Sequence, residues 1–289
     1  MDRTIPIARR SLLLDSTDHS RDSAGLRYVY PVVSRRAGGV SLGINLNPNN
    51  ACNWRCVYCQ VPNLTRGSAP EIDLPLLEME LRSMLEELLH GDFMAKHVPE
   101  DSRRLEDIAF SGNGEPTSAK AFQPSVELVV RLMEEFRLGE TIKLRLITNG
   151  SLLDRPDVRR AIDLLGQAHG EVWFKLDAGS RDGIKRINGV DLDPAGAVRR
   201  MRECGGRCTT WVQTCCFAFD GIAPNESEIL AWLDLLGQAG DRLAGVHLYG
   251  LARPSLQTEA SRLARLPQTW LDRLAERVRR MGLMVKISP

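Results

Sequence analysis

Long hydrophobic runs are missing from the 289-residue sequence, and no segment is apolar over enough residues to span a bilayer. The apolar run at 12–14 is too short for the core of a secretory signal, so we expect a cytoplasmic protein without a membrane partner. An excess of charge is also missing, because 38 basic residues face 37 acidic ones and the formal net charge is +1. No global electrostatic field therefore favours nucleic acid as a partner.

Cysteine is present, but we do not expect the seven cysteines of a protein in a reducing compartment to form a disulfide framework. Three of them, Cys52, Cys56 and Cys59, lie in residues 45–62, which we call the cysteine loop. Thiolates this close in sequence can face one centre, and they select iron-sulfur clusters, zinc or copper(I). A closed zinc site or an ordinary electron-transfer cluster takes four protein ligands. No fourth Cys or His lies in this loop, so one coordination position is left open.

The CxxxCxxC spacing, with Tyr58 directly before the last cysteine, resembles the radical S-adenosylmethionine (SAM) enzymes. The resemblance implies a [4Fe-4S] cluster on Cys52, Cys56 and Cys59, whose remaining iron binds the amino and carboxylate groups of SAM. It also implies reductive cleavage of SAM, hydrogen abstraction from a substrate, and a reductant such as flavodoxin or ferredoxin. The spacing alone shows a three-thiolate site, so the alternative is a non-catalytic iron-sulfur or zinc protein that acts as sensor, scaffold or electron carrier.

Strands and helices are expected to alternate along the chain, which predicts βαβ units and a parallel sheet. Six or seven such units are too few for a closed eight-fold barrel, so we predict an α/β open (β/α)6 partial TIM barrel, the fold that the resemblance implies. Residues 1–35 are polar and irregular and are interpreted as an N-terminal extension, and residues 36–289 as one domain. Strands are expected near 39–46, 106–111, 143–148, 171–177, 209–217, 243–249 and 283–287, and helices near 73–90, 124–138, 156–166, 193–204, 226–238 and 267–281.

The predicted strands carry apolar side chains on one face and polar side chains on the other. An interior lined by polar groups is unfavourable unless these groups are paired or meet a polar ligand, so the pattern indicates a wet binding cavity. The alternative is that Arg145, Lys175 and Asp177 form a buried ion network with one another. The candidates for substrate binding are Arg145, Gln213, His247, Tyr249 and Arg253.

Residues Gly114 and Glu115 follow the second predicted strand and resemble the GGE motif of the family, with Asn113 as a departure from that motif. The resemblance implies that they contact the amino group of SAM. It also places Tyr58 in the SAM pocket, together with three side chains at the ends of later strands: Asn149, Lys175 and Asp177. Lys175 and Asp177 have the chemistry to bind a carboxylate and two ribose hydroxyls, respectively.

Arg253 follows the sixth predicted strand at the cavity mouth, where it could clamp a carboxylate or phosphate or form a surface ion pair. The stretches at 114–117 and 248–254 look closest to the wybutosine-synthesis-like iron-sulfur oxidoreductases. Their tRNA chemistry uses further cysteines upstream, and this chain has no Cys before Cys52, so the tRNA substrate is not transferred. The substrate is left open as a small molecule, a peptide or a nucleotide-derived compound.

The remaining cysteines are Cys204, Cys208, Cys215 and Cys216. Cys215 and Cys216 are adjacent on a predicted strand and must point to opposite faces, so the four cannot converge on a second cluster without distorting that strand. We expect them to be buried and inert. Cys215, on the inward face, is also a hypothetical hydrogen-atom donor to a substrate radical.

Overall fold

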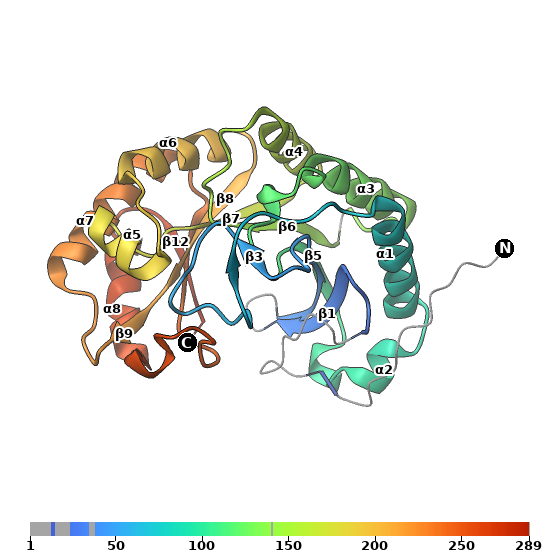
Figure 1. Cartoon of the computed structure of the whole chain (residues 1–289), viewed down its shortest axis with the longest axis horizontal. Coiled ribbons are helices and arrows are strands. Elements are labelled where there is room, and N and C mark those ends of the chain that lie inside the picture. The colour runs from blue at the N-terminus through green and yellow to red at the C-terminus, as the bar shows by residue number, and fades with distance from the viewer. Residues whose placement is uncertain (1–12, 15–23, 35–37, 140, 289) are drawn as a thin grey trace.

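A curved sheet of eight strands forms the centre of the protein, whose computed structural model describes residues 13–14, 24–34, 38–139 and 141–288. The first pair of strands is antiparallel and all the following pairs are parallel. The order across the sheet is β1 (Val29–Ser34), β2 (Gly39–Ile44), β5 (Leu105–Phe110), β6 (Lys143–Thr148), β7 (Glu171–Lys175), β8 (Thr209–Cys215), β10 (Gly245–Tyr249) and β12 (Met284–Ser288). The sheet curls into a half-barrel, which confirms the predicted partial barrel (Figure 1).

Helices line the outer side of this sheet, as Figure 1 shows, except that the short helix at 181–188 packs against the cysteine loop. Those of the described chain are α1 (Leu74–Leu89), α2 (Phe93–His97), α3 (Phe122–Glu135), α4 (Pro156–Gln167), α5 (Arg181–Asn188), α6 (Pro194–Gly205), α7 (Glu226–Ala239) and α8 (Gln268–Arg279). The smaller elements are β3 (Ala51–Cys52), β4 (Thr65–Arg66), β9 (Phe217–Phe219), β11 (Leu263–Arg265) and the single turns η1 (Glu100–Ser102), η2 (Pro116–Ser118), η3 (Gly240–Arg242) and η4 (Ala260–Arg262).

Local sequence explains where α1 begins and which side of the sheet forms the core. The carboxylate of Asp73 accepts a hydrogen bond from the backbone N–H of Leu76 at 3.0 Å, and Pro75 occupies the first turn, where it loses no helix hydrogen bond. On the sheet, Phe110 and Leu146 are fully buried beneath the outer helices. The helix expected near 73–90 and the predicted apolar faces of the strands are therefore confirmed.

Two local expectations are wrong, and one helix was not predicted. Val29–Ser34 was assigned to an irregular extension but forms β1, where Pro31 is tolerated because the strand lies at the edge of the sheet. The strand predicted at 209–217 ends at Cys215, after which β9 pairs with β11 in a separate small sheet. Helix α5 was not predicted, since it has only eight residues. The remainder of the predicted extension, residues 1–12, 15–23 and 35, lies outside the described residues.

Glu80 of α1 ties β1 to the rest of the protein. Its carboxylate, only 3% exposed, accepts hydrogen bonds from the backbone N–H groups of Arg27 and Tyr28, both at 2.8 Å, and of Val29 at 3.2 Å. Hydrogen bonds to a charged acceptor are stronger than those between neutral groups. This single side chain therefore fixes the segment that enters β1.

The substitution Glu80→Ala is expected to lower the free energy of unfolding by about 3 kcal/mol, because it leaves buried N–H donors without an acceptor. Urea denaturation measures the change. Glu86→Ala, an exposed position on the same helix, is the control and should change the free energy by no more than about 0.5 kcal/mol. Equal stability of the two variants would contradict the anchoring role of Glu80.

Candidate functional site

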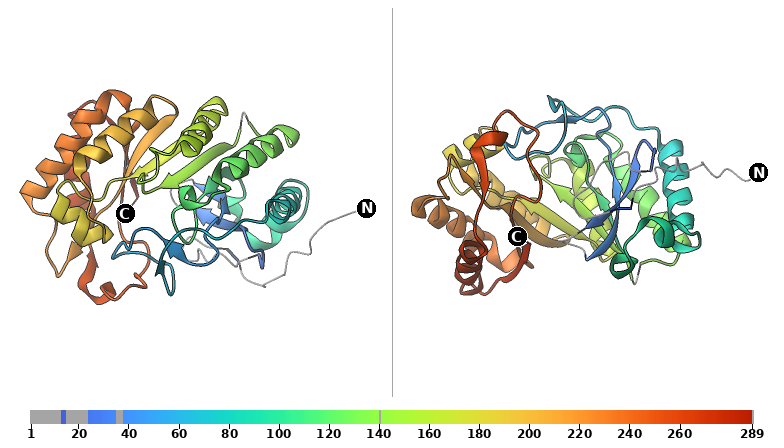
Figure 2. Two further views of the ribbon diagram at one scale, coloured as in Figure 1. Left: turned by 45° about the horizontal axis from the view of Figure 1, so that its top comes forward. Right: turned by 90° about the horizontal axis from the view of Figure 1, so that it is seen from below.

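The candidate site is a cavity of about 300 Å³ at the carboxyl ends of the parallel strands. The cysteine loop, light blue in Figure 2, follows β2 and crosses this end of the sheet. The residues predicted from the sequence that line the cavity are Cys52, Cys56, Tyr58, Cys59, Gly114, Glu115, Arg145, Asn149, Lys175, Cys215, Tyr249 and Arg253. Three other predicted residues do not line it: Asp177, Gln213 and His247.

The three thiols of the cysteine loop are half-buried in this cavity. The Cys52 sulfur accepts a hydrogen bond from the backbone N–H of Trp54 at 3.4 Å, and the Cys56 sulfur accepts one from the side-chain amide of Asn188 at 3.3 Å. Burial raises the pKa of Cys52 to about 11 and that of Cys56 to about 12, so these thiols are protonated in the metal-free protein. Metal binding would have to release the protons.

The donor set fits an iron-sulfur cluster. Among the described residues, no three His, Cys, Asp or Glu side chains are placed to hold one metal ion together. In a cluster each cysteine binds a different iron, so its ligands need not surround a single point. Three soft thiols in one cavity, with N–H donors to two of the sulfurs, are the residues that could hold such a group.

Glu115 organises the loop that follows β5. Its side chain is 2% exposed and accepts four hydrogen bonds: from the N–H and the hydroxyl of Thr117 at 3.2 and 2.6 Å, from the Thr148 hydroxyl at 2.6 Å, and from the N–H of Asn149 at 2.6 Å. Burial raises the pKa of Glu115, although these donors act in the opposite direction. The carboxylate thus joins the end of β5 to the end of β6.

Gly114 allows this loop to lie against the cysteine loop. A Cβ atom at this position would lie 2.1 Å from the carbonyl oxygen of Ala51, which is far inside van der Waals contact. Two asparagine pairs join strand ends to the cysteine loop: after β5, Asn113 Nδ2 donates to Asn50 Oδ1 at 2.7 Å, and after β6, Asn149 Nδ2 donates to Asn53 Oδ1 at 2.8 Å. The strand ends therefore hold the cysteine loop through side-chain amides.

Lys175 lies at the end of β7 between two tyrosines. Its ammonium group donates to the hydroxyl of Tyr58 at 2.8 Å and to that of Tyr249 at 3.3 Å, and Tyr58 in turn donates to Asp177 at 2.5 Å. Burial acts against the charge on Lys175, but the charges that Tyr249 and Asp177 can carry outweigh burial and raise its pKa. The cavity therefore contains one firmly cationic group beside the cysteine loop.

Arg145 faces the interior of the half-barrel, where its guanidinium pairs with the carboxylates of Asp107 and, at 3.2 Å, Glu171. It also lies 4.9 Å from the ring centre of Trp173. The alternative in which Arg145 pairs with Lys175 and Asp177 is therefore wrong, because the partners of Arg145 are two other carboxylates. The register of the sheet, which places Glu171 directly beside Arg145, decides the pairing.

Gln213 and His247 lie deeper than the cavity lining. The Gln213 amide donates to the Trp173 carbonyl oxygen at 3.0 Å, and the His247 ring lies between Trp173 and Trp211, with ring centres 4.4 and 4.7 Å apart. Both residues are buried. Their part in substrate binding stays a prediction, as does that of Arg253, which lines the cavity.

The four remaining cysteines are buried, as predicted. Cys204, Cys208 and Cys216 belong to the core between the sheet and the outer helices, whereas Cys215 faces the cavity. The adjacent pair thus points to opposite faces. Burial raises the pKa of Cys204 and of Cys208 to about 12, which leaves these thiols protonated and unreactive.

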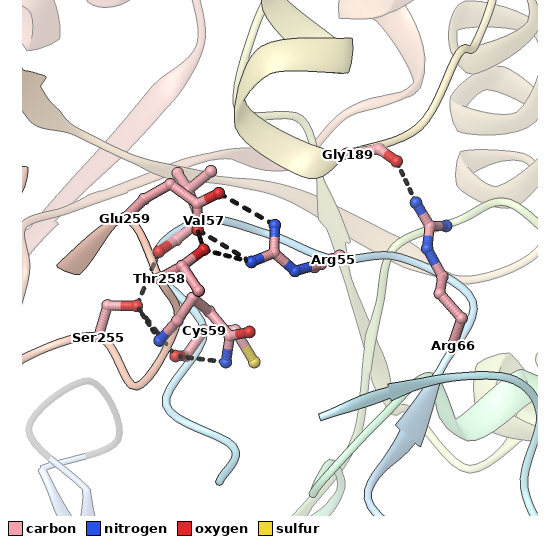
Figure 3. A network of polar contacts seen from close by, with 9 residues as sticks. Arg55, Val57, Cys59, Arg66, Gly189, Ser255, Thr258 and Glu259 are labelled. Atoms are coloured by element: carbon pink, nitrogen blue, oxygen red, sulfur yellow. Dashed lines mark hydrogen bonds and ion pairs between the residues drawn. The ribbon is translucent and has the colours of Figure 1, made fainter. Parts of the chain in front are cut away.

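A segment near the end of the chain, residues 253–259, packs on the cysteine loop, and sequence reasoning missed it. Figure 3 shows the Ser255 hydroxyl donating to the carbonyl oxygens of Val57 at 2.7 Å and Cys59 at 3.2 Å. It also shows the ion pair of Arg55 with Glu259 at 3.0 Å. These contacts join segments that are far apart in sequence, and no local sequence pattern predicts them.

Asn188 is a further part of the site that sequence reasoning missed. It is followed by Gly189, which adopts φ = 67° and ends α5. The Asn-Gly pair is a signal for a helix end, and it could have predicted where α5 stops. It could not have predicted that the Asn188 side chain reaches Cys56.

A family model described as "Radical SAM superfamily" matches residues 46–236. Two curated proteins are similar over part of the chain. "GTPase Obg" from Brachyspira hyodysenteriae is 29% identical over 187 residues, which cover 65% of this chain and 24% of that protein. "UPF0026 protein MJ1312" from Methanocaldococcus jannaschii is 32% identical over 158 residues, which cover 55% of this chain and 42% of that protein. The chain therefore spans less than half the length of these relatives.

Solved structures are similar to the fold. TYW1 with a lysine-pyruvate adduct bound matches with a TM-score of 0.54 and 16% identity, over 83% of this chain and 73% of that one. A radical SAM methyltransferase from Sphaerobacter thermophilus matches with a TM-score of 0.52 and 16% identity, over 86% of this chain and 66% of that one. At this level of identity the matches show the fold alone.

No helix in the described part of the chain is long and apolar enough to cross a membrane.

Proposed function

The chain belongs to the radical SAM superfamily, and from this premise we propose that it is an enzyme that cleaves SAM reductively and starts radical chemistry on a substrate. Cys52, Cys56 and Cys59 would hold a 4Fe-4S cluster. When bound, this cluster supplies the electron that cleaves SAM, and a reductant such as flavodoxin or ferredoxin replaces that electron. One observation carries the proposal: the three thiols line the same cavity as the ends of the parallel strands.

The side chains of the cavity suit the charged groups of SAM. Lys175 is a half-buried cation in the cavity wall that can bind a carboxylate, and its contacts with Tyr58 and Tyr249 fix its position. Gly114 lets its loop pack closely on the cysteine loop at the cavity wall, and Glu115 holds this backbone in place through its four hydrogen bonds. We assign Asn149, which also lines the cavity, to the same pocket.

The substrate would occupy the part of the cavity that reaches into the half-barrel. Arg145, Tyr249 and Arg253 line it, so both cationic and hydroxyl groups are available for a polar substrate. Arg145 is held by two carboxylates. Arg253 lies in the same cavity lining, and its guanidinium has the chemistry to bind an anionic substrate group. Cys215 lines the same cavity, and its role as a hydrogen-atom donor remains a hypothesis. The substrate itself stays open as a small molecule, a peptide or a nucleotide-derived compound.

The test is SAM cleavage by the anaerobically purified and reconstituted protein. We expect about four irons and four sulfides per chain, the visible absorption of a 4Fe-4S cluster, and formation of 5'-deoxyadenosine after reduction with dithionite. Omitting dithionite is the control and should abolish the product, because the cleavage needs an electron. Bound zinc without cluster absorption would instead favour a non-catalytic metal protein.

A further inference from the structure

The side-chain amide of Asn188 lies between a carboxylate and a cysteine of the cysteine loop. Asn188 is the last residue of α5 and is 1% exposed. Its Nδ2 atom donates to Asp177 Oδ2 at 2.7 Å and to the Cys56 sulfur at 3.3 Å. An amide nitrogen carries two hydrogens, so it can make both bonds at the same time.

Asp177 determines which way this amide points. Its Oδ2 also accepts from the Tyr58 hydroxyl at 2.5 Å, and its Oδ1 accepts from the backbone N–H of Cys215 at 3.0 Å. An ionised carboxylate only accepts hydrogen bonds, so the nitrogen of Asn188, and not its oxygen, must face Asp177. The same nitrogen then faces Cys56. Both oxygens of Asp177 are engaged by protein donors, which makes this residue a support of the cysteine loop.

The backbone fixes the distance between α5 and Cys56. On the two sides of Cys56, the N–H of Arg55 donates to the carbonyl oxygen of Asn188 at 3.0 Å, and the N–H of Val57 donates to that of Ile187 at 2.8 Å. Gly189 permits this approach, because a Cβ atom there would lie 2.8 Å from the Arg55 carbonyl oxygen. Figure 3 shows a further contact beside it, from the Arg66 guanidinium to the carbonyl of Gly189.

We propose that Asn188 is a positioning residue: it holds Cys56 and, through its N–H···S hydrogen bond, raises the reduction potential of the cluster. This inference rests on the proposed function. Hydrogen bonds to the sulfurs are among the features that set the potential of an iron-sulfur cluster. A donor stabilises the reduced state more than the oxidised state, because the sulfurs carry more negative charge after reduction. Residues that orient metal ligands act in this way in other metal sites.

The experiment is a redox titration of the reconstituted Asn188→Ala variant, followed by electron paramagnetic resonance of the reduced cluster. We expect a more negative midpoint potential, with the reduced-to-oxidised ratio at a fixed potential lowered about tenfold, or about 59 mV for a one-electron couple. The matched control is Glu259→Gln. It weakens another contact of the cysteine loop, the ion pair with Arg55, and this pair involves no cysteine sulfur. The potential of the control should equal that of the wild type.

The outcomes separate this inference from the proposed function. A wild-type protein that binds no iron overturns the proposed function, and this inference with it. A wild type with a cluster, together with an Asn188→Ala variant of unchanged potential, overturns this inference alone. If Asn188→Ala does not fold, as judged by circular dichroism, Asn188→Ser is titrated in its place. Its shorter side chain also removes the amide donor, and an unchanged potential in that variant overturns the inference too.

Discussion

Replacing Cys56 with alanine is expected to abolish cluster binding and to lower 5'-deoxyadenosine formation by more than roughly 100-fold. Loss of a residue that only supports a metal ligand can already cause a decrease of that size. The physical reason is that three thiolates are the whole protein contribution to the proposed cluster, so losing one leaves two. Cys52→Ala and Cys59→Ala should behave in the same way, because all three thiols line one cavity. Iron and sulfide analysis and a chromatographic assay of the product measure the two effects.

Cys208→Ala is the matched control for these variants. Cys208 is buried outside the cavity, where its thiol donates to the carbonyl oxygen of Gly170 at 3.3 Å. Its replacement should leave the iron content and SAM cleavage unchanged, and lower the free energy of unfolding by about 1 kcal/mol through lost packing. A Cys56→Ala variant that keeps its iron would refute the assignment of this ligand. Equal losses of iron content and of SAM cleavage in the Cys56 and Cys208 variants would indicate misfolding.

The substitution Glu115→Ala is expected to lower the free energy of unfolding by about 4 kcal/mol and to abolish SAM binding. It removes the acceptor of four hydrogen bonds and leaves buried donors on Thr117, Thr148 and Asn149 unsatisfied. The loop after β5 would lose its connection to the end of β6. Urea denaturation measures the stability, and equilibrium dialysis of the reconstituted protein measures SAM binding.

Glu115→Gln tests whether the charge or only the shape matters. The amide keeps one oxygen acceptor but turns an NH2 group towards another donor, so we expect a smaller loss of about 2 kcal/mol. The control is Glu134→Ala on the exposed side of α3, which should change the free energy by no more than about 0.5 kcal/mol. Wild-type stability in both Glu115 variants would show that the four hydrogen bonds contribute nothing.

The positions of the strands could be predicted because periodicity is local information. The strand predicted at 143–148 has the observed bounds, and the helix predicted from Asp73 begins one residue later because this residue is its N-cap. The cysteine loop was found in the same way, from the spacing of three residues. Strand β1 was missed because Pro31 interrupts its pattern, and its strand partner β2 is what makes it a strand.

Contacts between elements could not be predicted, because they depend on register and on loop closure. The partners of Arg145, Asp107 on β5 and Glu171 on β7, follow from the register of β6 against its two neighbouring strands, which a single sequence does not specify. The contact of Asn188 with Cys56 depends on the way α5 returns to the cysteine loop. Residue chemistry therefore predicted many of the side chains that line the cavity, although Asp177, Gln213 and His247 do not line it. The three-dimensional arrangement decided which side chains touch.

The packing of residues 253–259 on the cysteine loop has a consequence for the order in which the protein is made. Arg55 and Glu259 are 204 positions apart. At a synthesis rate of about 5–20 residues per second, the ribosome takes roughly 10 to 40 s to reach Glu259 after Arg55. The three thiols thus leave the ribosome long before the segment that packs on the backbone of their loop. A cysteine loop that has left the ribosome would therefore lack this support for that time, and the proposed cluster would meet the complete pocket only after translation has passed Glu259.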